Sequence, residues 1–302
     1  MNNRLLNFAA LGVAAFALLA VTWLPVSAQL ANQGDAKAAP KGKGKGKAKG
    51  DPIKHITTIE VNQPDFGGPG VWNVPYITNM GTKTNIINGG KEVCEEFANG
   101  AGGTTPTCAP FNERGKMVFA ARRQTDSATD PEGLCLPPGV PRMMYTPYPM
   151  KFVQEPNMIT MIFEGGAHVW RQIPLGPKGS LKHDPDFNPG YLGDSFGWWE
   201  GDTLVIDTVG FNERTWLDFA GHPHGEKLHV IERFTRLDSL SMDHSATIED
   251  PDFYTQPWTV TINVPYNATN HLIEYICQEN ESDSKHLWDN LRKKGIDPEK
   301  IP

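Results

Sequence analysis

The sequence of 302 residues contains neither a phosphate-binding loop nor a glycine-rich dinucleotide fingerprint, so nothing in it indicates a nucleotide-dependent enzyme. Its four cysteines include no C-x-x-C pair, the usual basis of a zinc ribbon or a thioredoxin-like redox site. Basic residues are concentrated at the start: the first 50 residues hold Arg4 and six lysines against one acid, Asp35, while the whole chain carries a net charge of −7. The remaining residues, 51–302, are therefore strongly acidic. Because a phosphate backbone requires neutralising cations, we expect this part of the chain not to bind nucleic acid.

Long apolar runs are also rare, and the one present lies near the start. Arg4 precedes an apolar run from Phe8 to Val26, which ends in the small-residue sequence Val26-Ser27-Ala28. This order predicts a signal peptide over residues 1–28, and therefore an exported protein that is periplasmic or extracellular. The run approaches the ~20 residues needed to span a bilayer, so a retained membrane anchor is the alternative.

Residues 29–50 form a Lys/Gly-rich segment that contains almost no bulky apolar side chain. Such a segment cannot offset the entropy lost on ordering, so we predict a disordered, flexible linker. The alternative is that its lysines contact an anionic surface such as lipid head groups or wall polymer.

Residues 51–150 are rich in turn-forming residues and predict an irregular segment that wraps a more regular domain. Short helices are expected around Gly90–Ala98 and over Phe111–Arg123. The apolar, proline-rich stretch LPPGVPRMMYTPYP would either line the mouth of a pocket or plug the end of a barrel, and we favour the plug.

Residues 151–302 predict an antiparallel β domain that ends in one amphipathic helix, SDSKHLWDNLRKKG. In the segment WTVTINV, apolar and polar residues alternate with the period of two that a half-buried strand requires. We expect a lipocalin-like or calycin-like β-barrel or a sandwich, and prefer the barrel because closure removes exposed edges. The expected strands are KFVQE, MITMIF, AHVWRQIPL, SFGWWE, TLVIDTV, LHVIERFTR, HSATIE, WTVTINV and HLIEYIC.

The even number of cysteines, in a chain predicted to be exported, suggests disulfide bonds. Cys94 and Cys108 would close a short loop, and Cys135 and Cys277 would then connect an early loop to the last strand. Four cysteines allow three pairings, and the sequence does not choose among them.

The stretch LGDSFGWWEGDTLVIDTVGFNERTWLD, followed by LHVIERFTR, EDPDFYTQPWTV and LIEYICQEN, resembles a large, uncharacterised family of exported bacterial proteins. The similarity covers roughly residues 135–281. The resemblance implies export and a β-rich fold, and it supplies no reaction and no catalytic residues.

Three histidines close together form the first candidate site: His222 and His224, separated by Pro223, and His229. Neutral imidazoles are common ligands of zinc, copper and iron, and the H-x-H order is partly similar to that of cupin metal sites. We therefore expect a divalent metal on these three residues, or else a surface loop with hydrogen-bonded histidines. Pro223 is awkward inside a strand, which weakens the cupin comparison.

Charged residues on otherwise apolar strand faces form the second candidate site. Glu232, Glu274 and Asp207 each lie among apolar neighbours at alternate positions. A buried carboxylate needs a cation, a metal or a retained proton, and Arg171 and Arg233 are candidate partners. The cluster would be either a structural ion-pair network or a polar lumen in which a carboxylate and a histidine act as acid and base.

His168 follows a glycine pair and would serve as a proton carrier or as a packed, hydrogen-bonded histidine. Ser195 lies in a Gly-Asp-Ser sequence, but its neighbours suggest strands rather than the strand–turn–helix that a serine nucleophile needs.

From these candidate sites together we predict an exported small-molecule enzyme of lyase, isomerase or hydrolase type, with a lipocalin-like carrier of an apolar ligand as the alternative. The expected catalytic set is His168, Arg171, Asp207, His222, His224, Glu232 and Arg233.

Overall fold

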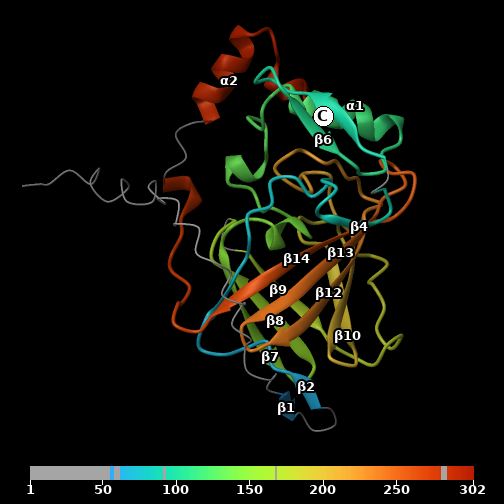
Figure 1. The fold of residues 1–302 in the computed structure, drawn as a ribbon, viewed down its shortest axis with the longest axis vertical. Coiled ribbons are helices and arrows are strands. Elements are labelled where there is room, and N and C mark those ends of the chain that lie inside the picture. The colour runs from blue at the N-terminus through green and yellow to red at the C-terminus, as the bar shows by residue number, and fades with distance from the viewer. Residues whose placement is uncertain (1–54, 58–61, 91–92, 167–168, 280–283) are drawn as a thin grey trace, which may run out of the picture. The chain divides into compact units, whose positions relative to one another are not determined.

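The computed structural model describes residues 55–57, 62–90, 93–166, 169–279 and 284–302 (Figure 1). The chain divides into two units, residues 1–48 and 49–302, and every described residue belongs to the second unit. The predicted signal peptide, the predicted linker and His168 therefore lie outside the described residues.

Over the described ranges, the regular elements are short strands, two α-helices and four 3-10 helices. The strands are β1 (His55–Thr57), β2 (Asn62–Pro64), β3 (Val71–Asn73), β4 (Ile86–Asn88), β5 (Glu95–Ala98), β6 (Thr104–Thr107), β7 (Pro149–Glu155), β8 (Met158–Phe163), β9 (Trp170–Pro174), β10 (Asp194–Glu200), β11 (Thr203–Val209), β12 (His229–Asp238), β13 (Ser241–Glu249) and β14 (Trp258–Asn267). The helices are α1 (Glu113–Arg123), α2 (Ser284–Lys293) and the 3-10 turns Glu132–Leu134, Arg142–Met144, Cys277–Glu279 and Pro298–Lys300.

Ten of the strands form one antiparallel sheet in the order β10-β11-β12-β13-β14-β3-β7-β8-β9, with β4 paired to β14. The predicted antiparallel, mainly β fold is therefore confirmed. In β14 the expected alternation is present, since Trp258, Val260, Ile262 and Val264 are all buried. β10 and β11 are joined by a tight turn at Gly201, whose φ of 59° favours glycine.

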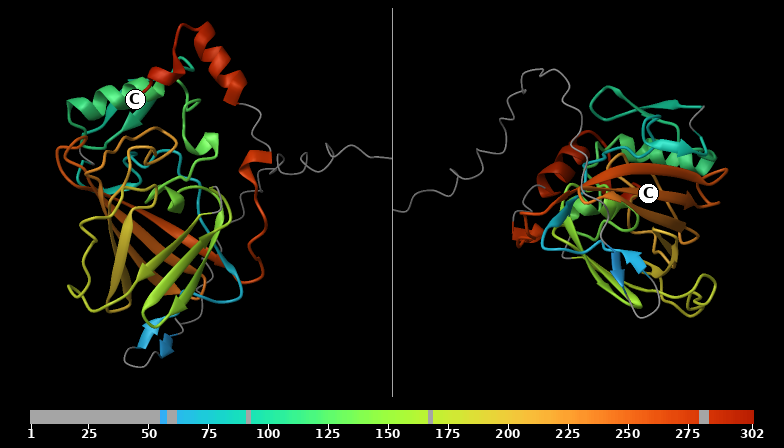
Figure 2. Two further views of the ribbon diagram at one scale, coloured as in Figure 1. Left: turned by 180° about the vertical axis from the view of Figure 1, so that it is seen from behind. Right: turned by 60° about the horizontal axis from the view of Figure 1, so that its bottom comes forward.

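The sheet folds over so that its two halves face each other across a shared core. Strands β7–β9 and β12–β14 lie on opposite sides of that core in Figure 2, and the rings of Phe152 on β7 and Phe234 on β12 are 5.7 Å apart. Over the described residues, the backbones of the end strands β9 and β10 are hydrogen-bonded only near Leu175 and Gly197, through one bridge and a 3.1 Å bond from Gly176 N to Gly197 O. The ladder is not continuous around the sheet, so the arrangement is sandwich-like rather than a closed barrel.

Two of the predicted elements are wrong. Glu95–Ala98 is a strand paired with β6, not part of a helix, and the disulfide Cys94–Cys108 connects the outer ends of this hairpin. The segment 271–277 is not a strand; it continues into a 3-10 turn, and Ile273 is 63% exposed rather than packed on the core.

The other expected helices are confirmed. Helix α1 begins after Asn112, whose side chain accepts the backbone N–H of Gly115, and it lies beside β6 at one end of the sheet (Figure 1). Such a side-chain cap satisfies an N–H group that the first turn leaves free. The C-terminal segment forms α2 as predicted.

Both disulfides are formed, Cys94 with Cys108 and Cys135 with Cys277. The second connects the segment before residue 277 to the loop that follows residue 130. Among the described residues, no helix has the length and apolar character that a membrane crossing requires.

Candidate functional site

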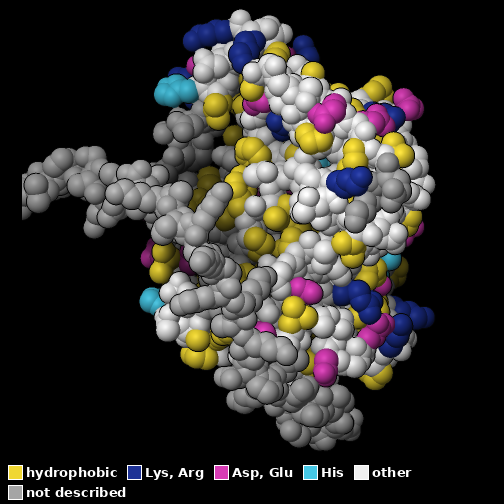
Figure 3. Space-filling view, viewed as in Figure 1, with side chains coloured by type: hydrophobic (Ala, Val, Ile, Leu, Met, Phe, Trp, Pro, Cys, Tyr) yellow, Lys and Arg dark blue, Asp and Glu magenta, His cyan; other side chains and the backbone are white. Residues whose placement is uncertain are grey.

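A cavity of about 470 Å³ opens between residues 130–148, the loop at Tyr76 and the segment that ends at Cys277. Figure 3 shows hydrophobic side chains gathered around a hollowed area of one face. The loop is positioned by a 2.9 Å hydrogen bond from Ile77 N to Tyr145 O. Five aromatic side chains line the cavity: Tyr76, Tyr145, Tyr148, Phe219 and Tyr275.

The aromatic rings stand in contacting pairs. Tyr76 and Phe219 meet edge to face with ring centroids 6.3 Å apart, and Tyr148 and Tyr275 lie 4.9 Å apart. Gly165 is needed behind Tyr148, because a Cβ at that position would collide with the tyrosine ring. Gly165 therefore makes room for the tyrosine ring that forms one wall of the cavity.

The polar part of the cavity is an ion-pair cluster centred on Arg142. Its guanidinium donates to both carboxylate oxygens of Asp130, at 2.7 and 2.6 Å, and to Glu132 Oε2 at 2.8 Å. Arg142 and Asp130 are almost fully buried. Asp130 Oδ1 also accepts the backbone N–H of Glu132 at 3.1 Å, which fixes the start of the turn Glu132–Leu134. Such a bidentate pair holds the guanidinium in one orientation.

Glu132 has one carboxylate oxygen in use and one free. Oε2 binds Arg142 and accepts the hydroxyl of Thr146 at 3.2 Å, whereas Oε1 is buried and has no hydrogen-bond partner among the described residues. Burial raises the pKa of Glu132, Arg142 opposes that rise, and the neighbouring Asp130 adds to it. A carboxyl group with a raised pKa in a cavity is a candidate acid or base.

Tyr145 connects this cavity to a second cluster in the core. Its hydroxyl is buried without a partner in the described structure, and its ring centroid lies 5.7 Å from that of His244. Burial, with a contribution from Glu232, holds the pKa of the Tyr145 phenol well above its usual value. The phenol therefore stays protonated at any physiological pH.

The second cluster joins the inner faces of β9, β12 and β13. Arg171 donates to Glu232 Oε2 at 2.7 Å, and His244 Nε2 lies 3.1 Å from Glu232 Oε1. All three side chains are buried. Burial acts to raise the pKa of Glu232, but the charge of Arg171 and the contact with His244 outweigh it, so the net shift is downward. Glu232 is thus an ionised partner of Arg171.

A separate groove of about 460 Å³ lies between β9 and β10 and reaches Arg171 and Ser195. Arg171 Nη2 donates to Ser195 Oγ at 3.1 Å and to Thr208 Oγ1 at 3.2 Å. Ser195 therefore contacts a guanidinium and a hydroxyl rather than an imidazole base. The geometry offers no support for a serine nucleophile here.

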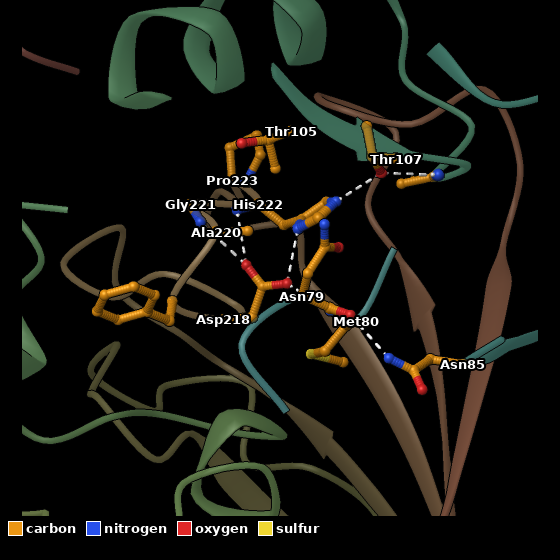
Figure 4. A network of polar contacts seen from close by, with 12 residues as sticks. Asn79, Met80, Asn85, Thr105, Thr107, Asp218, Ala220, Gly221, His222 and Pro223 are labelled. Atoms are coloured by element: carbon orange, nitrogen blue, oxygen red, sulfur yellow. Dashed lines mark hydrogen bonds and ion pairs between the residues drawn. The ribbon is translucent and has the colours of Figure 1, made fainter. Parts of the chain in front are cut away.

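His222 belongs to a fully buried network that Figure 4 shows. Its Nδ1 lies 2.7 Å from Asp218 Oδ2, and its Nε2 lies 2.7 Å from Thr107 Oγ1. Asp218 also accepts the backbone N–H groups of Met80, Gly221 and His222. Burial acts to raise the pKa of Asp218, but the His222 imidazole and the backbone N–H groups of Met80 and His222 outweigh it, so the net shift is downward. The network joins the loop at Met80, the end of strand β6 and the loop over residues 218–222 in the interior.

The other histidines of the expected metal site lie in different surroundings. His224 is buried with Nε2 at 2.6 Å from Thr215 Oγ1, and burial lowers its pKa to about 4. His229 binds Asp207 at 2.8 Å near the surface. Within the described ranges, no group of three His, Cys, Asp or Glu side chains is placed to hold a metal ion.

Two of the expected catalytic residues point away from the core. Asp207 is only half buried and accepts hydrogen bonds from His229 and His183, the latter at 3.1 Å. Arg233 is 41% exposed and pairs with Glu200. Among the expected catalytic residues that the structure describes, it brings together Arg171 and Glu232 and places Asp207, His222, His224 and Arg233 in other contacts.

Apart from the stretch LPPGVPRMMYTPYP, for which a pocket mouth was the less favoured alternative, the residues around the cavity were not predicted, because they lie in turns. The only sequence signal was two acids, Asp130 and Glu132, flanking Pro131 shortly before Arg142 in an apolar stretch. Comparison of the chain with protein-family models, curated proteins and solved structures finds no match. The fold and site define an antiparallel β-sheet protein with an aromatic cavity and a carboxyl group in its wall.

Proposed function

We propose that this chain is an exported protein that binds a small organic molecule in the aromatic cavity and acts on it by acid–base chemistry through Glu132. The reaction would be of lyase, isomerase or hydrolase type. The observation that carries the proposal is Glu132 Oε1, a buried carboxyl oxygen in a cavity wall that has no hydrogen-bond partner among the described residues. A buried polar atom of this kind is expected to be satisfied by a bound group.

The dimensions and lining of the cavity support binding of a small molecule. Its volume of about 470 Å³ lies within the range of ordinary ligand sites, which are largely apolar and carry few polar groups. The two disulfides support export, since such bonds persist mainly in oxidising compartments.

The chemistry assigned to Glu132 follows from its neighbours. In the protonated form, Oε1 would donate a proton to a bound acceptor, and the Arg142 guanidinium at Oε2 would stabilise the carboxylate that results. In the ionised form, the same oxygen would accept a proton. Asp130 fixes the guanidinium, so its role is positioning.

A carrier without catalysis is the second candidate. This candidate is favoured by the ion pair between Arg142 and Glu132 Oε2 and by the pair between Arg142 and Asp130. These contacts leave few polar groups that could act on a ligand. A carrier site needs only one or two polar anchors in an apolar pocket.

A fragment screen by ligand-observed NMR on the purified, disulfide-bonded chain tests both candidates. Fragments that bind the wild type are expected to bind Glu132→Gln with altered affinity, and to bind the exposed control Glu155→Gln as the wild type does. Chemical conversion by the wild type that Glu132→Gln abolishes supports the enzyme. Binding without conversion supports the carrier. Absence of any fragment in the cavity contradicts the proposal.

A further inference from the structure

We propose that the cavity selects a small organic cation, an amine or a quaternary ammonium group held against aromatic faces. This inference rests on the proposed small-molecule site and names the class of its ligand. It is carried by the charge of the cavity wall and by the arrangement of the rings.

None of the described residues that line the cavity offers an uncommitted basic side chain to an anionic ligand. Among the described lining residues, Arg142 is the only basic side chain, and it stands against two carboxyl groups, Asp130 and Glu132. Its guanidinium is 5% exposed and already donates to both acids. With Glu132 ionised, the three groups together carry a negative charge. An anion would therefore meet repulsion without a donor, whereas a cation would be attracted.

The rings provide the surfaces that a cation prefers. Tyr76 is 53% exposed and Phe219 is 39% exposed, so both present aromatic surface to an incoming group. Their planes meet at 66°, which forms a corner of two aromatic walls. Tyr148 and Tyr275 supply a second pair at the same cavity. Cations are attracted to ring faces, and cages of several rings recognise ammonium groups.

Tyr76 and Tyr148 remain neutral. Burial raises the pKa of Tyr76, with Arg142 opposing that shift, and burial also raises the pKa of Tyr148. Neutral phenol rings keep the electron-rich face that attracts cations and add no charge of their own. The negative charge of the wall therefore comes from the carboxyl groups alone.

Calorimetric titration of the purified, disulfide-bonded chain with three probes of one shape tests the inference. The probes are choline, its neutral isostere 3,3-dimethyl-1-butanol, and the anion 3,3-dimethylbutanoate. Choline is expected to bind about tenfold more tightly than the neutral isostere, the size of a desolvated cation–ring contact, and the anion most weakly.

Two variants test separately how the aromatic ring faces and the carboxylate charge contribute to choline binding. Phe219→Leu keeps apolar volume but removes a ring face, so choline affinity should fall about 3- to 30-fold while the affinity of the neutral probe changes little. Glu132→Gln should weaken choline in the same selective way. Phe187→Leu, in the separate groove between β9 and β10, is the matched control and should leave choline binding unchanged.

The outcomes distinguish this inference from the proposed function. Equal binding of choline and its isostere, or tighter binding of the anion, would overturn the cation assignment and leave a small-molecule site. Failure of all three probes, with other fragments bound in the cavity, would also overturn the cation assignment alone. Failure of the probes and of every fragment would overturn both proposals.

Discussion

The ring of Tyr145 lies 5.7 Å from the ring of His244, so one side chain lines the cavity and also packs on the buried cluster of Arg171, Glu232 and His244. We therefore expect a change in that cluster to alter the packing of one cavity wall. The stability of the cluster thus bears on the proposed function.

Arg171→Met is expected to lower the free energy of unfolding by about 3–5 kcal/mol, because it leaves Glu232 as a buried charge without its cation. Guanidinium unfolding followed by tryptophan fluorescence measures the change. Arg233→Met is the matched control, since Arg233 is 41% exposed and its pair with Glu200 should contribute at most about 1 kcal/mol. Equal losses in the two variants would contradict the assigned roles.

Glu132→Gln should change how stability depends on pH. Because the folded state raises the pKa of Glu132 above its ordinary 4.5, the unfolded chain releases this proton first as the pH rises. The contribution of Glu132 to stability is therefore complete below about pH 4 and declines until the raised folded value is passed. Urea unfolding between pH 3.5 and 8 should show that decline in the wild type and in Glu155→Gln. A decline that persists unchanged in Glu132→Gln would contradict this assignment.

His222→Ala should lower the free energy of unfolding by about 2–4 kcal/mol, because it removes the buried imidazole that contacts both Asp218 and Thr107. Elemental analysis of the wild type and the variant should give the same zinc, iron and copper content. Loss of a stoichiometric metal on this substitution would instead support the metal site expected from the sequence.

The imidazole of His229 should titrate above its ordinary pKa of 6.5, because its hydrogen bond to Asp207 favours the charged form more than burial opposes it. The resulting stability is complete below about pH 6.5 and is lost as the pH rises through the raised folded value. NMR titration should show a lower His229 midpoint in Asp207→Asn. Asp194→Asn, which contacts His183 but not His229, should leave the midpoint unchanged. A wild-type midpoint at or below 6.5 would be inconsistent with the contact.

The strands of the sheet were predictable because their side chains alternate in burial. In β12, Val230, Glu232 and Phe234 share the inner face, and the expected need of Glu232 for an arginine is met by Arg171. The alternation rule did not fix the faces of β11, where Val205 is fully buried although the side chain of Asp207, two residues on, is 20% exposed. Both faces of that strand are partly covered, so its pattern is ambiguous.

The cavity was not predictable because its polar groups lie in turns. Turns have no periodicity that would show where the side chains of Asp130, Glu132 and Arg142 point. The rings that complete the cavity, Tyr76 and Tyr275, lie far from these residues in the sequence. The stretch around residue 142 was expected to plug a barrel or line a pocket mouth, and it lines the cavity. The segment 271–277 resembled a strand in composition, but nothing in it indicated that Ile273 would be exposed.

The disulfide Cys135–Cys277 has a practical consequence for any assay of this protein. Tyr275 lies two residues before Cys277, so the crosslink restrains its position. The same bond joins the turn that carries Glu132 to a part of the chain 142 residues further on. A preparation made in a reducing cytoplasm would lack this crosslink. The segment that carries Tyr275 would then be held against the cavity by non-covalent contacts alone. Ligand screens should therefore begin from material whose thiol content has been measured as zero.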